Sequence, residues 1–420
     1  MIRIVALALV LILTPAAHAE LRGHGGPVRA LAVSPDGRIA LSGSFDQSAI
    51  LWGIDQGAAL AVLRFHDGAV NAVAALPDGR FATAGEDGRI AFWRAGQGAP
   101  ERVAEGHAGP IVALTVAGDR IASASWDGTA RIWALDGTAP RVLAGHQGNV
   151  NGVAFLPDGR IVTAGYDATL RLWPKDGGDP AVVQLATPLN GVAVAPDGEL
   201  VAGGADGTVR IFDAKGTERA AVETGPRPVI ALGVSPDGTR IAAATVGGSV
   251  AVIERANART QFTLVGPGLP VWSIAFRPDG QELLTGGADR LVRRWDLATG
   301  QHIGAVAMAR PEDFLAGFKG ERGAEVFQAC AACHTLTPDG GNRAGPTLHG
   351  IFGRRIASLA GYNFSPALKN LDIVWNADTI AKLFEVGPQA YTPGTKMPEQ
   401  TIGSAADREA LVRFLEKATR

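Results

Sequence analysis

Residues 145–173 read GHQGNVNGVAFLPDGRIVTAGYDATLRLW, and this stretch decides the fold of most of the chain. Two apolar runs, each of strand length, flank the turn Pro157-Asp158-Gly159. Proline presets the backbone of such a turn and glycine permits positive φ, so the sequence predicts a hairpin. Four further positions of the stretch hold polar or aromatic side chains: His146, Thr163, Asp167 and Trp173.

The same markers recur about every 40 residues between residues 20 and 307, which is the period of a propeller blade. One position holds Asp46, Asp87, Asp127, Asp167, Asp206, Gly247 and Asp289. Six residues later come Trp52, Trp93, Trp133, Trp173, Phe212, Ile253 and Trp295. Four residues before the first position stand Ser42, Thr83, Ser123, Thr163, Ala202, Ala243 and Thr285. Because each register is marked independently, we predict seven blades.

These residues resemble the WD40 propeller family, and the resemblance covers about two thirds of the chain. It implies an all-β domain in which the His, Ser or Thr, Asp and Trp of one repeat form a buried hydrogen-bond chain. The histidines at that position are His24, His66, His107 and His146, so we assign them to structure and not to a metal. Repeats five and six lack most of the four residue types and repeat seven lacks the histidine. The last three blades are therefore expected to be the least rigid.

Closure of the ring is expected from the carboxy-terminal end of the propeller. Only Glu20, Leu21 and Arg22 precede the first Gly-His pair of the exported chain, which we take as too few for an outer strand. Residues 301–307 are therefore expected to complete blade seven, without exchange of strands between the two ends.

Side chains at the turns of one propeller face suggest a protein-binding surface. The residues just before the repeated aspartates are Phe45, Glu86, Trp126, Tyr166, Ala205, Val246 and Ala288. Five positions beyond the histidine position come Arg29, Asn71, Val112, Asn151, Asn190, Ile230 and Trp272, which we expect on the same face. Exposed Trp, Tyr and Arg are frequent binding anchors, so the candidates for partner contact are Trp126, Tyr166, Phe45, Arg29 and Trp272. The alternative is that these side chains pack against neighbouring loops or the carboxy-terminal domain.

A different chemistry begins at Cys330-Ala331-Ala332-Cys333-His334, which contains both cysteines of the chain. Thiols at this spacing can add to the two vinyl groups of one haem, and the adjoining histidine then ligates iron. A structural zinc site usually needs four ligands, and the chain has no second cysteine pair. A thioredoxin-like pair needs no histidine and sits in a βαβ setting. The motif therefore predicts one covalent haem c, held by Cys330, Cys333 and His334.

Methionine is the expected second axial ligand of the iron. Met1 is the initiator and Met308 precedes the motif, whereas Met397 follows it within the sequence PGTKMP. A His/Met pair is common in electron transfer and raises the reduction potential relative to two nitrogen ligands. His349 is the alternative ligand, so two candidates remain, with Met397 preferred.

From Gly323 to its end the chain resembles class I cytochrome c of the mitochondrial and bacterial short-chain kind. The matching residues are Gly323, Phe327, Cys330, Cys333, His334, residues 345–350 (GPTLHG), Gly353, Arg354, Trp375 and residues 391–397 (YTPGTKM). The resemblance implies an all-α domain that carries electrons on haem.

The family pattern also implies roles for residues around the haem. Pro346 is expected to offer its carbonyl oxygen to the second ring nitrogen of His334, which fixes the orientation of the ring. Trp375 and Thr395 are expected to bond the haem propionates, with the charge of Arg354 near them.

Two departures from the family concern the reduction potential and the surface charge. Phe364 and Phe384 stand where many members have tyrosine, and hydrogen bonds to ligands tune the potential. From residue 319 onward twelve Lys and Arg face ten Asp and Glu, a net charge of +2. Electrostatic steering toward acidic partners is therefore expected to be weak.

Helical periodicity appears in the last hundred residues. The expected helices cover residues 321–329, 377–386 and 407–418, and the last places Leu411, Phe414 and Leu415 on one face. A Pro- and Gly-containing joint at residues 309–317 separates them from the repeats. The expected organisation is a signal peptide (1–19), a propeller (20–307), a linker (308–318) and a cytochrome domain (319–420).

The first residues resemble an export signal. Arg3 supplies a positive charge, Ile4 to Leu13 form an apolar run, and Ala17-His18-Ala19 fits small-x-small cleavage before Glu20. Ten apolar residues reach only about 15 Å as a helix, half of a bilayer core, so we expect cleavage and no stable membrane span. Export agrees with the haem motif, because bacterial c-type haem is attached outside the cytoplasmic membrane. We expect a periplasmic protein, which stays membrane-anchored if the signal is retained.

Three functions follow from this organisation. The preferred one is a carrier of single electrons whose haem edge meets a redox partner protein and whose propeller binds an unidentified protein. The alternatives are a redox enzyme with a site in the propeller and a scaffold that responds to the haem oxidation state. The propeller lacks an evident nucleophile–base pair or phosphate cradle, so we lean away from an enzyme. A net charge of −2 without a basic tract argues against a nucleic-acid partner.

Overall fold

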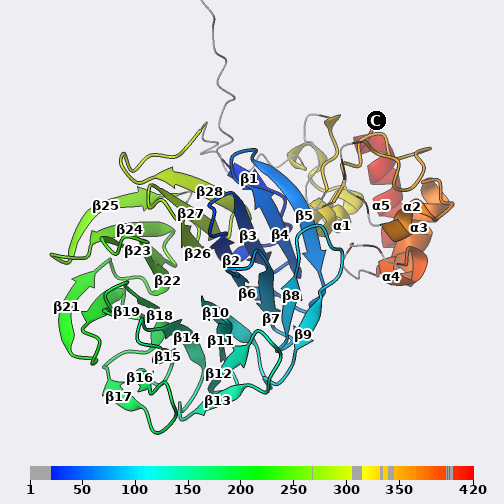
Figure 1. Cartoon of the computed structure of the whole chain (residues 1–420). Helices are drawn as coiled ribbons and strands as arrows, with labels where there is room; N and C mark the ends of the chain where they lie inside the picture. The colour runs from blue at the N-terminus through cyan, green and yellow to red at the C-terminus, as the bar shows by residue number, and fades with distance from the viewer. Residues whose placement is uncertain are drawn as a thin grey trace, which may run out of the picture.

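The computed structural model describes residues 20–266, 268–304, 315–331, 334–338, 345–360, 362, 364, 366–393, 395, 397 and 401–420. Two domains are visible in Figure 1, a ring of sheets and a smaller helical body at its side. The ring consists of seven sheets, each with four antiparallel strands, as the repeats predict.

Blade one consists of β2 to β5, the following blades take four strands each up to β25, and blade seven consists of β26 to β28 with β1. The strands are β1 (Glu20–Arg22), β2 (Val28–Val33), β3 (Ile39–Ser44), β4 (Ser48–Gly53), β5 (Ala58–Arg64), β6 (Val70–Ala75), β7 (Phe81–Gly85), β8 (Ile90–Trp93), β9 (Arg102–Ala104), β10 (Ile111–Ala117), β11 (Arg120–Ser125), β12 (Thr129–Ala134), β13 (Arg141–Ala144), β14 (Val150–Phe155), β15 (Ile161–Gly165), β16 (Thr169–Trp173), β17 (Ala181–Gln184), β18 (Leu189–Val194), β19 (Leu200–Gly204), β20 (Thr208–Phe212), β21 (Glu218–Glu223), β22 (Val229–Val234), β23 (Arg240–Thr245), β24 (Ser249–Glu254), β25 (Arg259–Val265), β26 (Val271–Phe276), β27 (Glu282–Gly287) and β28 (Leu291–Asp296).

The outer edge of β28 is completed from both ends of the propeller, so the expected closure without strand exchange is wrong. As expected, chain after residue 300 pairs there: His302 bridges Trp295, and the Ile303 amide donates to the Arg294 carbonyl oxygen at 3.0 Å. β1 pairs antiparallel with β28, and Glu20 lies opposite Arg293. Arg293 Nη1 donates to Glu20 Oε1 at 2.6 Å, while Leu21 is buried. A three-residue outer strand also occurs in blade two, where β9 forms it. The two ends of the propeller therefore exchange strands.

In blades one to four, a chain of hydrogen bonds connects the strands, as blade three illustrates. His107 Nδ1 lies 2.7 Å from Asp127 Oδ2, and His107 Nε2 lies 2.7 Å from Ser123 Oγ. Trp133 Nε1 donates to the same Ser123 Oγ at 2.8 Å. Burial raises the pKa of Asp127, but the hydrogen bonds from Thr129 and His107 outweigh it and hold the pKa at about 2. The four side chains thus satisfy one another inside the blade.

Blades five to seven keep the four-stranded geometry with only fragments of this chain. In blade seven, Trp295 Nε1 donates to Thr285 Oγ1 at 2.9 Å. In blade five, Asp206 instead forms an ion pair with Arg210 at 2.6 Å. Blade six has the fully buried Ile253 at the tryptophan position. Apolar packing between strands is therefore sufficient for a blade, and the hydrogen-bond chain adds to it.

The carboxy-terminal domain is helical, as expected. Its helices are the 3₁₀ helix η1 (Ala316–Phe318) and the α-helices α1 (Arg322–Ala331), α2 (Pro366–Lys369), α3 (Ala377–Val386), α4 (Pro388–Tyr391) and α5 (Ala405–Ala418). α3 has the predicted bounds, and α1 and α5 differ from the predicted helices by one or two residues at their ends. None of the described helices has both the length and the apolar character that crossing a membrane requires.

Close packing of α1 against α5 forms the frame of this domain. A Cβ on Gly323 would collide with the carbonyl oxygen of Ala410 and with Phe414, so only glycine allows this approach. Beside that contact, the rings of Phe327 and Phe414 lie 5.4 Å apart. α3 starts with a capping box in which the Asn376 side chain accepts from the Thr379 amide. Together the three helices hold the residues that surround the candidate site.

Candidate functional site

A cavity with about 1170 Å³ of empty space, part of it open to solvent, lies in the carboxy-terminal domain. Its wall is mostly apolar and includes Phe327, Leu348, Ile351, Ile356, Phe364, Leu368, Trp375, Ile380, Leu383, Phe384, Leu411 and Leu415. The described wall contains three arginines, Arg64, Arg354 and Arg355, and no Asp or Glu. The cavity therefore suits a large apolar ligand that carries negative charge.

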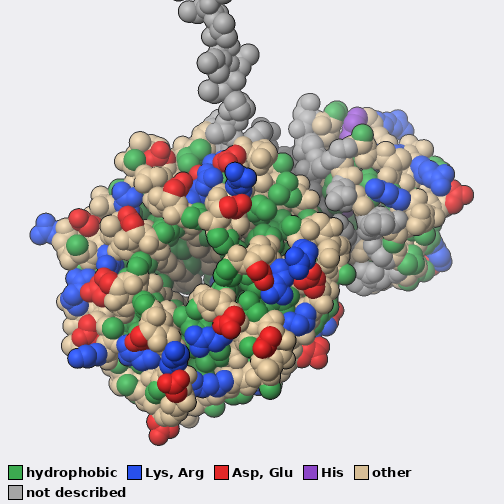
Figure 2. Space-filling view, viewed as in Figure 1, with side chains coloured by type: hydrophobic (Ala, Val, Ile, Leu, Met, Phe, Trp, Pro, Cys, Tyr) green, Lys and Arg blue, Asp and Glu red, His purple; other side chains and the backbone are tan. Residues whose placement is uncertain are grey.

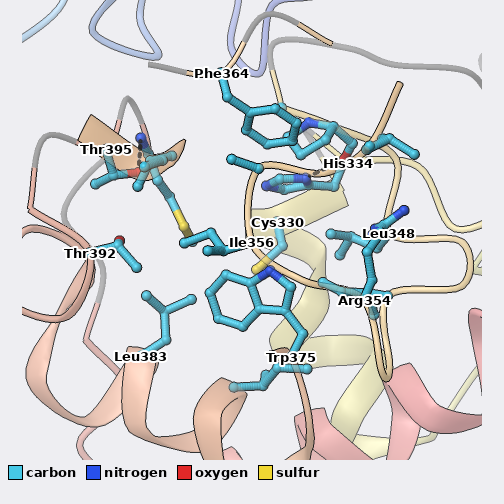
Figure 3. Close-up of a pocket in the computed structure, with 18 of the residues that line it drawn as sticks. Cys330, His334, Leu348, Arg354, Ile356, Phe364, Trp375, Leu383, Thr392 and Thr395 are labelled. Carbon is cyan, nitrogen blue, oxygen red and sulfur yellow. Dashed lines mark hydrogen bonds between the residues drawn. The ribbon is translucent and has the colours of Figure 1, made fainter. Parts of the chain in front are cut away.

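His334 lies in this wall with its ring orientation fixed. Nδ1 of His334 is 2.7 Å from the carbonyl oxygen of Pro346 (Figure 3). A carbonyl only accepts, so Nδ1 carries the proton and Nε2 keeps the lone pair that ligates a metal. Gly345 allows this arrangement, because a Cβ there would occupy the position of the His334 ring. The family role expected of Pro346 is matched by this contact.

The cysteine of α1 belongs to the same cavity. Cys330 is buried and lines it, and the backbone amide of His334 donates to the Cys330 carbonyl oxygen at 3.0 Å. This bond ties the backbone of His334 to the last turn of α1. The second cysteine of the motif, Cys333, lies outside the described residues, as do Met308 and residues 1–19.

Met397 lines the cavity together with the two threonines that precede it. The amide of Thr395 donates to the carbonyl oxygen of Thr392 at 3.0 Å. Thr395 Oγ1 accepts from the Met397 amide at 3.1 Å, which ties the methionine to this turn. Figure 3 shows Thr395 and His334 on either side of the cavity. The structure thus brings both candidate axial ligands to one space.

Arg354 and Trp375 form another side of the wall. Arg354 Nη2 donates to the Thr347 carbonyl oxygen at 2.9 Å, and Nη1 donates to that of His349 at 3.2 Å. Burial lowers the pKa of the Arg354 guanidinium from its usual high value. The Trp375 amide donates to the Arg354 carbonyl oxygen at 3.0 Å, and Figure 3 shows the Trp375 indole at the cavity. Arg354 therefore braces the loop that follows Pro346.

Three other residues singled out in the sequence occupy different places. His349, the alternative ligand, is not among the described residues of the cavity wall. Phe364 lines the cavity and its ring lies 4.7 Å from that of Tyr362. Phe384 is buried in α3 and faces the same space. Both phenylalanines add apolar surface where a tyrosine would add a hydroxyl.

Surface charge on the two domains is mixed. In Figure 2 acidic and basic side chains alternate over the visible propeller face, which is hollowed at its centre. On the carboxy-terminal domain, basic side chains outnumber acidic ones in this view. The described residues on this face of the domain are therefore more basic than acidic, and the net charge of residues 319–420 is +2.

One mouth of the propeller channel is lined by a residue from every blade, which we call the channel-end ring: Arg29, Asn71, Val112, Asn151, Asn190, Ile230 and Trp272. Some members connect neighbouring blades. Asn151 Nδ2 donates to the Leu189 carbonyl oxygen at 2.8 Å, and Asn190 Nδ2 donates to that of Val229 at 2.9 Å. No group of three or more His, Cys, Asp or Glu among the described residues is placed to hold a metal ion.

The aromatic candidates for partner contact fall into two groups. Phe45 and Trp272 meet edge to face with centroids 6.4 Å apart, and Arg29 lies 5.5 Å from the Trp272 centroid. These three side chains therefore pack partly on one another. Trp126 is 46% exposed and Tyr166 is 60% exposed; Phe45 is similarly exposed at 43%, but its ring packs on Trp272. Trp126 Nε1 donates to Asn151 of the channel-end ring at 3.0 Å.

Sequence reasoning missed Arg64, which the structure brings to the cavity from the outer strand of blade one. No local signal marks this residue, because it lies two positions before His66 within an ordinary repeat. Only the placement of one domain against the other reveals it.

Comparison with protein families identifies both parts of the chain. The family model for cytochrome c matches residues 320–419. The family model for the WD domain, G-beta repeat, matches residues 17–53, 57–94, 98–134, 137–174, 184–213 and 258–296, together about half of the chain. The matched ranges leave out residues 214–257, which contain β22 to β24 of blade six. Blade six has none of the four hydrogen-bonding residue types at the repeat positions.

Known proteins match the carboxy-terminal domain along almost their whole length. Cytochrome c of Gibberella zeae is 42% identical over 107 residues, which are 25% of this chain and 100% of that protein. Cytochrome c of Cochliobolus lunatus is 45% identical over 101 residues, 24% of this chain and 93% of that protein. Cytochrome c of Arabidopsis thaliana is 44% identical over 101 residues, 24% of this chain and 89% of that protein.

Proposed function

The chain belongs to the cytochrome c family, with a propeller of WD40 repeats before the cytochrome domain, and we propose that it is an exported carrier of single electrons. One haem, attached through Cys330 and Cys333, is the proposed cofactor. When bound, it supplies an iron centre that accepts and releases one electron. The observation that carries this proposal is the His334–Pro346 hydrogen bond at the wall of an apolar cavity.

The proposed axial ligands are His334 and Met397. The Pro346 carbonyl holds the proton on Nδ1 and so keeps Nε2 of His334 available to a metal. Thr395 anchors the backbone of Met397 on the other side. With both side chains bound to iron, the haem would have no free position for a substrate and would be suited to outer-sphere electron transfer, and a thioether ligand would favour a high potential.

Other residues of the wall are proposed to set the environment of the haem. Phe364, Leu383 and Phe384 exclude water from the cavity. The guanidinium of Arg354 lies at the wall and supplies positive charge toward the propionates, while its N–H groups hold the neighbouring loop. Trp375 and Thr395 are proposed as further propionate contacts.

The ligand assignment is tested with matched variants of the purified holoprotein. Haem that remains on the denatured chain, at one iron per chain, supports covalent attachment. Met397→Ala is expected to lower the midpoint potential and change the absorption spectrum, whereas the control His349→Ala leaves both unchanged. A spectral change in the His349 variant and none in the Met397 variant would reverse the assignment.

We further propose that the protein works in the periplasm. The positive charge at Arg3, the short apolar run and the small residues at 17 and 19 support export. Attachment of haem to a Cys-x-x-Cys-His motif takes place in the same compartment. Fractionation of the cells followed by sequencing of the mature amino terminus tests this, and a protein that starts at Met1 in the cytoplasm contradicts it.

The propeller is proposed as a docking platform for a protein that exchanges electrons with the haem. Trp126 and Tyr166 are the exposed anchors, and holding a partner there raises its concentration near the cytochrome domain. Replacing both by Ala should abolish co-purification of the redox partner with the holoprotein. Val182→Ala, at an exposed site on the outer strand β17, is the control, and unchanged capture by the Trp126/Tyr166 variant overturns the assignment.

A further inference from the structure

An arginine of the propeller lines the cavity of the cytochrome domain. Arg64 is the last residue of β5, whereas every other described residue of the wall lies between 327 and 415. Figure 1 shows β5 beside α1, and in Figure 3 the blue ribbon of the propeller passes near Phe364 at the cavity. Blade one therefore contributes one cationic side chain to the described wall.

The guanidinium of Arg64 has hydrogen-bonding capacity that the described protein groups do not use. Its Nη1 lies 3.5 Å from the carbonyl oxygen of Asp46, at the outer limit of a hydrogen bond. Its Nε is buried without a hydrogen-bond partner among the described residues. The same is true of Arg102, Arg131 and Arg171 in blades two to four, but of these arginines only Arg64 lines the cavity. Leaving a buried N–H of a charged group unsatisfied is costly, so the position favours an anionic acceptor inside the cavity.

The wall itself offers no such acceptor in the part that the structure describes, because it contains no carboxylate. The other two arginines of the wall already have protein partners. Arg354 donates to two carbonyl oxygens, and Arg355 lies 3.4 Å from Asp372. Haem carries two propionate carboxylates, which are the acceptors that a guanidinium prefers.

We propose that Arg64 binds a propionate of the haem, so that the cofactor itself joins the cytochrome domain to blade one. This inference rests on the proposed occupancy of the cavity by haem. It makes Arg64 a positioning residue for the cofactor and gives the propeller a direct electrostatic effect on the reduction potential.

The repeat provides matched substitutions for Arg64. Arg64 pairs with Ser48, and the same register in other blades holds Ala144, Gln184, Glu223, Val265 and Arg22. A propeller blade therefore accepts many residue types at this position, and Arg64→Gln introduces the residue type that blade four has there, Gln184. Gln184 Nε2 donates to the carbonyl oxygens of Ala168 and Leu185, which shows that glutamine satisfies this position. Arg22→Gln is the control, since Arg22 occupies the register in blade seven and pairs with Glu20.

A cation near the haem favours the reduced state, because reduction removes one positive charge from the iron. Arg64→Gln should therefore lower the equilibrium constant for reduction by up to about tenfold, which equals about 59 mV for a one-electron couple. Arg64→Lys keeps the charge and should recover most of the difference. Arg22→Gln should leave the equilibrium constant for reduction within twofold of the wild-type value.

The test is a redox titration of the full-length holoproteins, with small-angle scattering of the same samples. A lower potential and a larger radius of gyration in Arg64→Gln alone, with haem content and absorption spectrum unchanged, are the expected result. The inference is overturned if the equilibrium constant for reduction of Arg64→Gln stays within twofold of the wild-type value, or if the Arg64 and Arg22 variants show equal decreases. In both cases the electron-carrier proposal stands. A wild-type protein without covalent haem overturns both.

Discussion

The buried polar groups of the propeller and of the cytochrome domain are satisfied in different ways. In blade three, His107, Asp127, Ser123 and Trp133 bond to one another at 2.7–2.8 Å. In the cytochrome domain, core residues such as Phe327 instead form the wall of an apolar cavity that is partly open to solvent. The hydrogen-bond chain of blade three therefore needs no group from outside its blade. The interior of the cytochrome domain is one that we propose the haem to complete.

The largest expected effect follows from preventing haem attachment. In the double variant Cys330→Ser/Cys333→Ser, residues 319–420 should lose their protection from hydrogen exchange, because a domain of this size is stable by only about 5–15 kcal/mol. Strands of the propeller should keep their protection. Peptide-resolved hydrogen exchange measures both domains in one sample.

A graded control keeps this experiment interpretable. Cys330→Ser alone leaves one cysteine for attachment, so its cytochrome domain should show intermediate protection. Full protection in the double variant would mean that the core is complete without the cofactor, and the contrast between the domains would fail.

The next effect tests the hydrogen-bond chain within the propeller. Ser123→Ala leaves the buried His107 Nε2 and Trp133 Nε1 without their shared partner and should cost about 2–4 kcal/mol. Thr285→Val in blade seven removes only the bond to Trp295 and should cost about 1–2 kcal/mol. Denaturant unfolding of the propeller gives both values. Equal costs would show that the complete chain stabilises a blade no more than its fragment does.

The two domains also illustrate what a sequence can predict. The blades were predictable because several positions of each repeat recur at a fixed spacing. Blade six was recognised from the positions of Gly247 and Ile253 in that spacing. The lengths of α1, α3 and α5 followed from apolar periodicity. Closure by β1 was not predictable from length, since a three-residue strand is held by the long-range pair of Glu20 and Arg293.

Residues of the candidate site differ in the same way. His334 and Pro346 were found because a local motif and a family pattern mark them, and their contact is present. Arg64 was missed because its significance depends on how two domains meet, which no local pattern encodes. Side chains that act across a domain boundary are therefore the part of a site that sequence reasoning reaches last.

A smaller effect concerns how the stability of the propeller depends on pH. Burial lowers the pKa of His107 and His146, although hydrogen bonds to Asp127 and Asp167 partly oppose it. The unfolded chain, with histidine near 6.5, then binds more protons, so stability is complete above about pH 6.5 and falls as the pH decreases. Each histidine contributes at most about 1.4 kcal/mol per pH unit.

Unfolding of the propeller measured between pH 7 and 5 checks this, and His107→Gln should reduce the slope. Protonation would also reverse the hydrogen bond between Nε2 of His107 and Ser123, which already accepts from Trp133. A second loss is expected between about pH 4 and 2, where Asp127 and Asp167 become protonated in the unfolded chain while the native carboxylates, with pKa values of about 2, stay largely ionised. A flat profile down to pH 5 contradicts the assignment of neutral histidines.

The smallest effect compares two tryptophans of one blade. Trp126 is 46% exposed and Trp133 is 3% exposed, although only seven positions separate them. Trp126→Ala should change the free energy of unfolding by less than about 0.5 kcal/mol, because water replaces its single bond to Asn151. Trp133→Phe, which removes the buried bond to Ser123, should cost about 1–3 kcal/mol. If both variants lose the same stability, Trp126 is a structural residue of the propeller face, and its role as a docking anchor loses its physical basis.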